Sequence, residues 1–158
     1  MTDVRGRLIR IVLDGESLHR LSALQEADLG QAVKDLQSEN EFIPAAQPGL
    51  QSLLHLSIQQ GRLVFDIRDL EDEPVQTVIL ALGPFKMLIK DYQMLLDSYA
   101  SAVADGREAR IQAIDMGRRG LHNEGAELMM ERLKSKVEID FPTARRLFTL
   151  VCALHQKL

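Results

Sequence analysis

Residues 109–133 concentrate the side chains of this sequence that could do chemistry. Three of the ten glycines fall within nine positions there, among charged and polar residues. The set is Asp115, Gly117, Arg118, Arg119, Gly120, His122, Asn123, Glu124 and Gly125. Arginine forks suit carboxylates and phosphates, and an imidazole can exchange a proton near neutral pH. The stretch is therefore either a site or a helix that needs room beside it.

A helix over 107–134 would give this stretch a continuous apolar stripe at about 100° per residue. The stripe comprises Ile111, Ile114, Gly117, Leu121, Gly125 and Leu128. The glycines complete the apolar face, which is typical of a helix that packs closely against another. Because each interior glycine costs about 1 kcal/mol relative to alanine, close packing or function must offset that cost.

On the same helix, one acid, two arginines and one histidine would share a flank, at spacings i, i+3, i+4 and i+7. Asp115 can pair with Arg118 or Arg119, and the two guanidinium groups would favour a neutral His122. His122 is then the candidate general acid or base, oriented by Asp115 or Glu124. The candidate ligand-binding residues are Arg118, Arg119, His122 and Asn123.

A glycine loop across 117–125 is the alternative geometry, with backbone N–H groups that hold an anion where a second helix begins. The chain contains no GxxxxGK[ST] motif, and no strand precedes this run, which excludes a P-loop. Asp115 and Arg119 could also form a purely structural ion pair. The sequence leaves open whether 115–125 is a continuous helix or an anion-binding loop.

Composition narrows the classes of function. The chain has 158 residues, enough for a single domain, 1–158, with its own core. Aromatic residues make up 4% and tryptophan is absent, which argues against a stacking platform for nucleic acid or sugar. The net charge of −4 also argues against a nucleic-acid partner. Basic residues exceed acidic ones only after residue 106, in the part that holds the candidate site.

Cofactor, metal and membrane signals are not found in the sequence. Cys152 is the single cysteine and lies in an apolar run, so we expect a buried core residue. His19, His55 and His155 lack metal-ligand spacing, and we expect neither a metal nor another cofactor. The N-terminal residues do not resemble a secretion signal, and no run approaches the ~18 apolar residues of a membrane span. These features predict a cytoplasmic protein without membrane contact.

The elements that position the candidate residues follow from hydrophobic periodicity. Residues 7–15 alternate as a half-buried strand, residues 26–40 show helical spacing, and residues 42–49, with two prolines and a glycine, predict a loop. Three closely spaced strands then predict an antiparallel meander. They span 53–60, 61–69 and 74–83. The last is apolar on both faces, so we expect it to be central or covered on both sides.

Helices dominate the second half of the chain. Residues 84–104 form a long amphipathic pattern that begins with a proline, and the helix over 107–134 follows. A short extended segment, KVEID, precedes a last helix from Phe141. Strands first and helices after predict an α+β fold. We expect an antiparallel β-meander of three or four strands, packed against a C-terminal bundle of about three helices.

The chain contains four long and specific segments: RLVFDIRD (62–69), LGPFKMLIKDY (82–92), AIDMGRRGLHNEGAELMMERL (113–133) and DFPTARRLFTLVCALH (140–155). Through them it resembles uncharacterised protein family 0262 of alphaproteobacteria. The resemblance extends from about Arg7 to His155, less clearly over 16–50. It implies a small soluble bacterial protein and no particular activity.

Two kinds of function fit these observations. The first is a non-enzymatic interaction or regulatory protein that binds an unknown protein partner, or a second copy, through a flat or convex face. Its contact residues would be Arg118, Arg119, His122, Arg145 and Arg146. The second is a small enzyme or sensor of a phosphate- or carboxylate-bearing ligand at Arg118, Arg119 and His122. It requires Asp115, Arg118, His122 and Glu124 to converge in a concave pocket.

Overall fold

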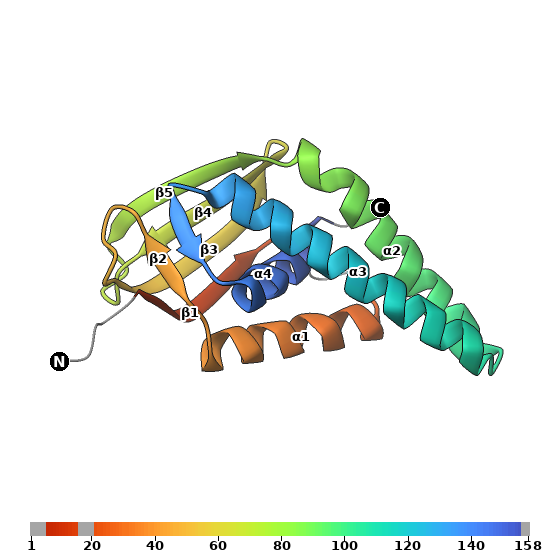
Figure 1. Ribbon diagram of the computed structural model, residues 1–158. Coiled ribbons are helices and arrows are strands. Elements are labelled where there is room, and N and C mark those ends of the chain that lie inside the picture. Colours follow the sequence, from red (N-terminus) through yellow and green to blue (C-terminus); the bar gives the residue numbers. More distant parts are fainter. Residues whose placement is uncertain (1–5, 16–20, 156–158) are drawn as a thin grey trace.

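The computed structural model describes residues 6–15 and 21–155, which form a four-stranded sheet, a two-stranded ribbon and four helices (Figure 1). In chain order the elements are β1 (Arg7–Asp14), α1 (Ala23–Ser38), β2 (Phe42–Pro44), β3 (Gln51–Gln59), β4 (Arg62–Arg68), β5 (Pro74–Ala81), α2 (Gly83–Ala104), α3 (Glu108–Leu133), β6 (Val137–Ile139) and α4 (Phe141–Leu154). The α+β class predicted from the sequence is confirmed.

The four-stranded sheet is mixed, with strand order β1-β3-β4-β5. Strands β3, β4 and β5 form the predicted antiparallel meander. Strand β1 pairs with β3 in parallel, so the prediction of a purely antiparallel sheet is wrong. The reason is the long connection through α1 and β2, which returns the chain to the end of the sheet where β1 begins.

Strand β5 lies at the edge of this sheet, so the prediction of a central or doubly covered strand is also wrong. Val78 and Leu80 face the core, whereas Ile79 is 51% exposed on the other face. Isolated apolar residues are common on protein surfaces, and Ile79 is one of them.

The two-stranded ribbon joins distant parts of the chain. Strand β2 pairs with β6 in antiparallel fashion, with Phe42 opposite Ile139. The predicted loop over 42–49 therefore begins with a short strand, and the predicted extended segment KVEID contains β6. The ribbon connects the end of α1 to the start of α4 and so fixes both helices relative to the sheet.

Three of the four helices match their predicted ranges within one or two residues, and each has a local reason to begin where it does. Asp140 caps α4 by accepting from the Thr143 N–H at 3.0 Å, and a proline lies in the first turn of α2 and of α4. Helix α1 begins with a capping box in which Ser22 and Gln25 bond each other's backbone N–H groups.

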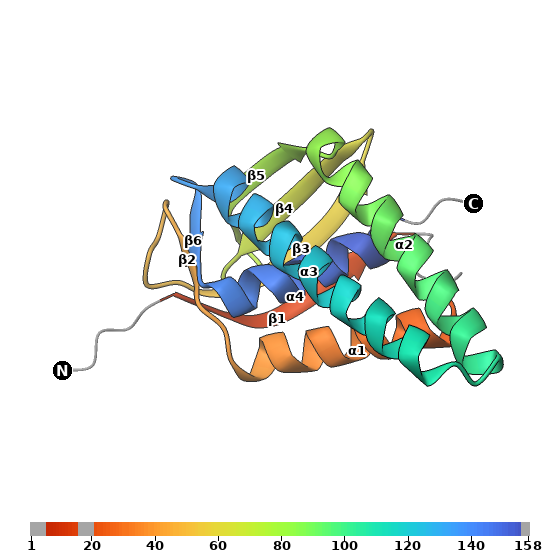
Figure 2. The ribbon, with the colours of Figure 1, turned by 45° about the vertical axis from the view of Figure 1, so that its right-hand side comes forward.

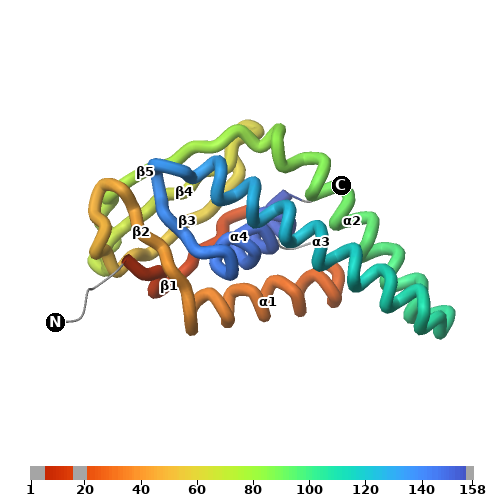
Figure 3. The backbone as a smooth tube through the Cα atoms, viewed as in Figure 1, coloured from red at the N-terminus to blue at the C-terminus, as the bar shows by residue number. Residues whose placement is uncertain are grey.

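The helical layer contains α1 as well as the three C-terminal helices, so the prediction of about three is low by one. In Figures 1 and 3, α1 lies along one side of α4 and α3 crosses its other side. Figure 2 shows α2 and α3 as a long pair that extends beyond the sheet. Among the described residues, no helix combines the length and apolar character needed to cross a bilayer.

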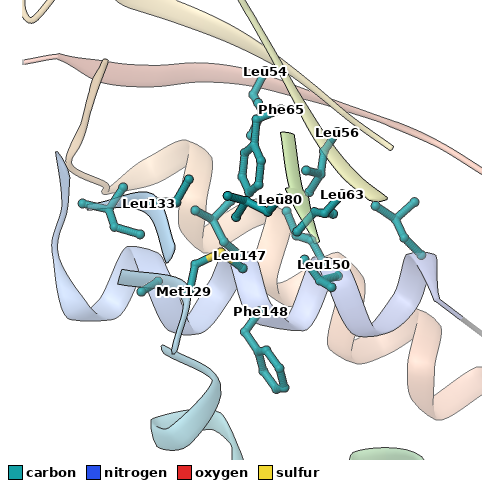
Figure 4. Packing of buried hydrophobic residues seen from close by; sticks show 14 of the residues in the cluster. Leu54, Leu56, Leu63, Phe65, Leu80, Met129, Leu133, Leu147, Phe148 and Leu150 are labelled. Atoms are coloured by element: carbon teal, nitrogen blue, oxygen red, sulfur yellow. The ribbon is translucent and has the colours of Figure 1, made fainter. Parts of the chain in front are cut away.

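Helix α4 is the centre of the core, because the sheet covers one side of it and the other helices cover the rest. All of its residues from Leu147 to Leu154 are buried. Figure 4 shows Leu147 and Leu150 on the side that faces Leu56 and Leu80 of the sheet. Phe148 points to the opposite side, where α3 passes.

Candidate functional site

Helix α3 carries the candidate residues and runs unbroken from Glu108 to Leu133, through all three glycines. The continuous helix predicted as one of two geometries is therefore confirmed, and the anion-binding loop across 117–125 is wrong. One helix now fixes the relative directions of the candidate side chains.

The three glycines of α3 meet different surroundings. A Cβ added at Gly125 would overlap the ring of Phe148 on α4, so close packing requires glycine there. At Gly117 an added Cβ would make an ordinary contact with Leu95 at 3.7 Å. At Gly120 it would meet no atom of residues 6–15 and 21–155 within 4 Å. Close helix packing thus explains Gly125 and leaves Gly120 without a packing reason.

Four helices bring polar side chains together at one place, which we call the helix junction. Its members are Asp28 of α1, Tyr92 of α2, Asp115, Arg118 and His122 of α3, and Thr149 of α4. Arg118 lies at its centre, 3.1 Å from Asp28 and 3.0 Å from Asp115. The Tyr92 hydroxyl donates to the same Asp28 carboxylate. The arginine charge is therefore balanced by two carboxylates that are, like the arginine, partly buried.

His122 is held at both ring nitrogens. Nδ1 lies 2.9 Å from the Arg118 carbonyl oxygen, and Nε2 lies 3.0 Å from the Thr149 hydroxyl. Because a carbonyl oxygen only accepts, Nδ1 carries the proton in the neutral ring. Nε2 and the Arg145 carbonyl oxygen, which is 3.3 Å from the Thr149 hydroxyl, then compete for the single proton of that hydroxyl. The rings of Tyr92 and Phe148 stand edge-on to the imidazole, with centroids 5.2 and 6.0 Å away.

Burial lowers the pKa of His122 below its ordinary value of 6.5 and favours the neutral imidazole. The charges of Arg145 and Arg118 lower the pKa further, against the opposing effects of the Arg118 carbonyl and Asp28. A neutral His122 was predicted from the two neighbouring arginines. The direction is confirmed, but the main cause is burial rather than charge.

The pKa values of Tyr92 and Arg118 are shifted in the direction that favours their ordinary charge states. Burial and the bond to Asp28 raise the pKa of Tyr92. Burial lowers the pKa of Arg118, but the carboxylates of Asp28 and Asp115 outweigh burial and leave it raised. Cys152 is buried, as predicted, and burial raises the pKa of its thiol.

Next to the junction, α1, α3 and α4 enclose an open groove with a volume of about 320 Å³, which we call the arginine groove. It is lined by Asp28, Gln31, Ala32, Asp35, Arg118, Arg119, His122, Pro142, Arg145, Arg146 and Thr149. Four arginines against two aspartates leave a formal excess of two positive charges along its lining. The groove therefore favours an anionic occupant.

The four arginines differ in their exposure and in the ion pairs and hydrogen bonds that they form within the described residues. Arg118 belongs to the helix junction. Arg119 is 72% exposed and lies 3.2 Å from Asp115. Arg146 donates to the Glu39 carbonyl at 3.3 Å. The buried Nε of Arg145 has no hydrogen-bond partner within residues 6–15 and 21–155.

Asn123 and Glu124 lie apart from the other candidates. They follow His122 by about 100° and about 200° around the helix, and both are exposed. Neither belongs to the lining of the arginine groove. The structure therefore brings together Asp115, Arg118, Arg119 and His122, and it separates Glu124 from the histidine that it was expected to orient.

A second polar cluster lies on the outer face of the sheet, and we call it the sheet cluster. Arg68 lies 2.8 Å from Asp66 and 3.2 Å from Asp72. His55 Nε2 lies 3.2 Å from the same Asp72. The sequence does not single out these residues. Alternation shows only that His55, Asp66 and Arg68 face away from the core, and Asp72 lies in the connection between β4 and β5.

The prediction also missed three members of the helix junction, because they come from other helices. Asp28 and Tyr92 lie 90 and 64 residues away from their partners along the chain. The available signals were a tyrosine at a core position, whose hydroxyl needs a partner, and a threonine, Thr149, inside an apolar run.

His19 lies outside the described residues. Within the described ranges, no group of three or more acidic, histidine or cysteine side chains could hold a metal ion.

Likeness to known proteins extends over nearly the whole chain. The family model described as "Uncharacterised protein family (UPF0262)" matches residues 5–157. A UPF0262 protein of Acidiphilium cryptum is 64% identical, over 98% of this chain and 96% of that protein. A UPF0262 protein of Granulibacter bethesdensis is 60% identical, over 96% of this chain and 91% of that protein.

A third relative, a UPF0262 protein of Maricaulis maris, is 45% identical, over 99% of this chain and 98% of its own. No solved structure matches the chain. The full-length likeness confirms the resemblance carried by the four sequence segments. The chain therefore belongs to the uncharacterised protein family UPF0262.

Proposed function

We propose that this protein is a non-enzymatic interaction or regulatory module, and that its arginine groove binds an acidic segment of a partner protein. The observation that supports this most directly is the gathering of four arginines around one open groove. An extended acidic segment can place several carboxylates against such a surface, and each arginine offers a planar fork that matches a carboxylate.

Three of the four arginines that line the groove remain available for a partner. Arg118 is held by Asp28 and Asp115, and so it supports the groove from within. Arg119 is largely exposed, and neither Arg145 nor Arg146 forms an ion pair within the described ranges. Arg119, Arg145 and Arg146 are therefore the proposed contact residues.

The geometry around His122 favours binding over catalysis. A general base needs a nitrogen that can reach the proton it removes, and both nitrogens of His122 are bonded within the protein. Of the two proposed orienting acids, Glu124 lies elsewhere on the helix, and Asp115 pairs with Arg118 and Arg119. The acid–base pair that the enzyme hypothesis requires is therefore not assembled.

A small anionic ligand in the same groove is the second candidate. One observation favours it: the buried Nε of Arg145 lacks a partner in the described part of the chain, and a bound carboxylate or phosphate oxygen would supply one. The groove volume of about 320 Å³ lies at the lower end of the range for small-molecule sites.

Photo-crosslinking in the native host tests the proposal. A photoreactive amino acid in place of Gln31, which is exposed and lines the groove, should crosslink to an acidic peptide of a partner protein. The crosslink should disappear when Arg145→Glu and Arg146→Glu are added. The same photoreactive residue in place of Gln112, which is exposed on α3, is the matched control.

Three outcomes separate the hypotheses. A crosslinked peptide without acidic residues, or an equal yield from position 112, would contradict binding of an acidic segment. A crosslink to this chain itself would identify a homodimer. For the second candidate, a thermal-shift screen with phosphorylated metabolites should show stabilisation that Arg145→Ala removes and that Arg62→Ala, on β4, retains.

A further inference from the structure

A second groove lies along the outer side of α2, at the opposite end of α4 from the arginine groove. It has a volume of about 480 Å³, and we call it the methionine groove. It is lined by Gly83, Lys86, Met87, Ile89, Lys90, Gln93, Met94 and His155. It shares no lining residue with the arginine groove, so a ligand at one site does not require the other.

The lining follows one stripe of α2. Gly83, Met87, Lys90 and Met94 are spaced at i, i+4, i+7 and i+11, which places them on one side of the helix. At a rise of 1.5 Å per residue, this stripe is about 16 Å long, or three helical turns. A partner helix of about three turns would match its full length.

The floor of the groove is apolar and adaptable. Met87 is 69% exposed and Met94 is 57% exposed, although both are large apolar side chains. Exposed apolar surface of this kind marks interaction sites, and methionine adapts its shape to the side chains that pack against it. A Cβ built on Gly83 would meet no atom of the described residues within 4 Å, so that end of the stripe is open toward them.

The rim of the groove is basic. Lys86 and Lys90 are exposed, and neither forms an ion pair within the described residues. Their spacing of four residues places both ammonium groups along the same edge of the stripe. A partner with apolar residues on one face and carboxylates beside them would satisfy the floor and the rim together.

We infer that the methionine groove docks an amphipathic helix of a partner protein, about three turns long and with an acidic flank. Apolar anchors at i, i+3 or i+4, and i+7 of that helix would pack on Met87 and Met94. Carboxylates on its flank would pair with Lys86 and Lys90. This surface is additional to the arginine groove and does not depend on the function proposed for it.

Methyl NMR of methionine tests this inference directly. The chain has six methionines, so labelling of the methyl groups with ¹³C gives a small set of signals that single substitutions assign. The probe is a panel of synthetic amphipathic peptides about three turns long, with leucines on one face and glutamates on the flanks. The signals of Met87 and Met94 should shift saturably, whereas that of Met116, which is 72% exposed on α3, should not.

Variants separate this site from general charge effects. Lys86→Glu combined with Lys90→Glu should weaken the binding of the peptide about tenfold. Lys34→Glu, a matched change at an exposed lysine of α1, should leave the affinity unchanged. Arg145→Glu should also leave it unchanged, so failure here is distinguishable from failure of the arginine groove.

Four outcomes would overturn the inference. They are an equal shift at Met116, equal binding of peptides flanked by lysines, no saturable shift with any peptide of the panel, and shifts with phosphatidylglycerol vesicles but not with peptides. The last result would assign the groove to a lipid surface rather than to a helix.

Discussion

The helix junction and the sheet cluster contain the same types of residue but differ in their surroundings. The junction has Arg118 between Asp28 and Asp115, with His122 beside it. The sheet cluster has Arg68 between Asp66 and Asp72, with His55 beside it. Bond lengths are similar, from 2.8 to 3.2 Å. The difference lies in what surrounds each cluster.

At the junction, neighbouring elements hold the charged groups in place. The Tyr92 hydroxyl donates to Asp28, and the Thr149 hydroxyl and the ring of Phe148 both contact His122. In the sheet cluster, Asp72 is 56% exposed and water competes for its carboxylate. Exposed ion pairs contribute about 0–1 kcal/mol, whereas hydrogen bonds to partly buried charges contribute about 1.5–3 kcal/mol. Residue type and spacing therefore do not separate a structural cluster from a solvated one. The exposure of the carboxylate that two partners share does separate them, at 24% for Asp28 and 56% for Asp72.

The largest expected effect is that of Asp28→Ala. It removes the acceptor of both Tyr92 and Arg118, so the free energy of unfolding should fall by about 3 kcal/mol. Asp72→Ala, the matched change in the sheet cluster, removes a carboxylate that is 56% exposed and is shared by His55 and Arg68, and it should cost less than about 1 kcal/mol. Urea denaturation of both variants measures the difference. Equal losses would mean that burial does not distinguish the two clusters.

Close packing beside the junction gives the next largest effect. Gly125→Ala should lower the free energy of unfolding by about 1–3 kcal/mol, because the new methyl group would overlap the ring of Phe148. Adding Phe148→Leu should recover part of this loss by making room. A Gly125→Ala protein as stable as the wild type would show that α3 and α4 can move apart at no cost.

The pH dependence of stability should reveal the buried histidine. Because the pKa of His122 is lower in the folded protein, the unfolded chain binds the proton more tightly. Stability is then complete above about pH 6.5 and declines as the pH falls, by at most about 1.4 kcal/mol per unit. Urea unfolding between about pH 5 and pH 7.5 should show that His122→Gln removes this part of the decline and that His55→Gln retains it. The reverse pattern would assign the pH dependence to the sheet cluster.

The smallest expected effect has the opposite sign. Gly120 lies on α3 with no atom near the position of a Cβ, so Gly120→Ala should raise the free energy of unfolding by about 0.5–1 kcal/mol. Thermal unfolding monitored by circular dichroism measures this gain. A loss instead would show that Gly120 has a packing role, for example against a second copy of the chain.

Local patterns predicted the ranges of the helices well, but not always their covered side. Of the stripe predicted for α3, only Ile114 and Gly125 are buried, and the other buried residues of the helix are Ala126, Met129 and Leu133. The long helices α2 and α3 and the start of α4 at Phe141 follow from such stripes and from proline positions. The parallel pairing of β1 and the edge position of β5 could not be predicted in this way. Both features depend on the end and the side of the sheet to which a connection leads the chain. Alternation within a strand does not indicate either.

Only the contacts of the candidate site that lie within α3 could be predicted from the sequence. The ion pairs of Asp115 with Arg118 and Arg119 are local, at i+3 and i+4. The bond of Arg118 to Asp28 joins residues 90 positions apart. Periodicity shows that a helix face is covered, but it does not show which residue covers it. Arg118 was predicted to bind a ligand, but its pairing with Asp28 leaves it to support the arginine groove.

Calorimetric titration of a short polyglutamate peptide measures whether Arg145 and Arg146 of the arginine groove bind an acidic segment while the helix junction supports them. The variant to compare with the wild type combines Arg145→Glu and Arg146→Glu, and Arg62→Glu is the control. The combined variant should bind at least about tenfold more weakly and should unfold at the same urea concentration as the wild type. Unchanged binding in the combined variant, or an equal loss in the Arg62→Glu control, would show that these arginines do not bind an acidic segment.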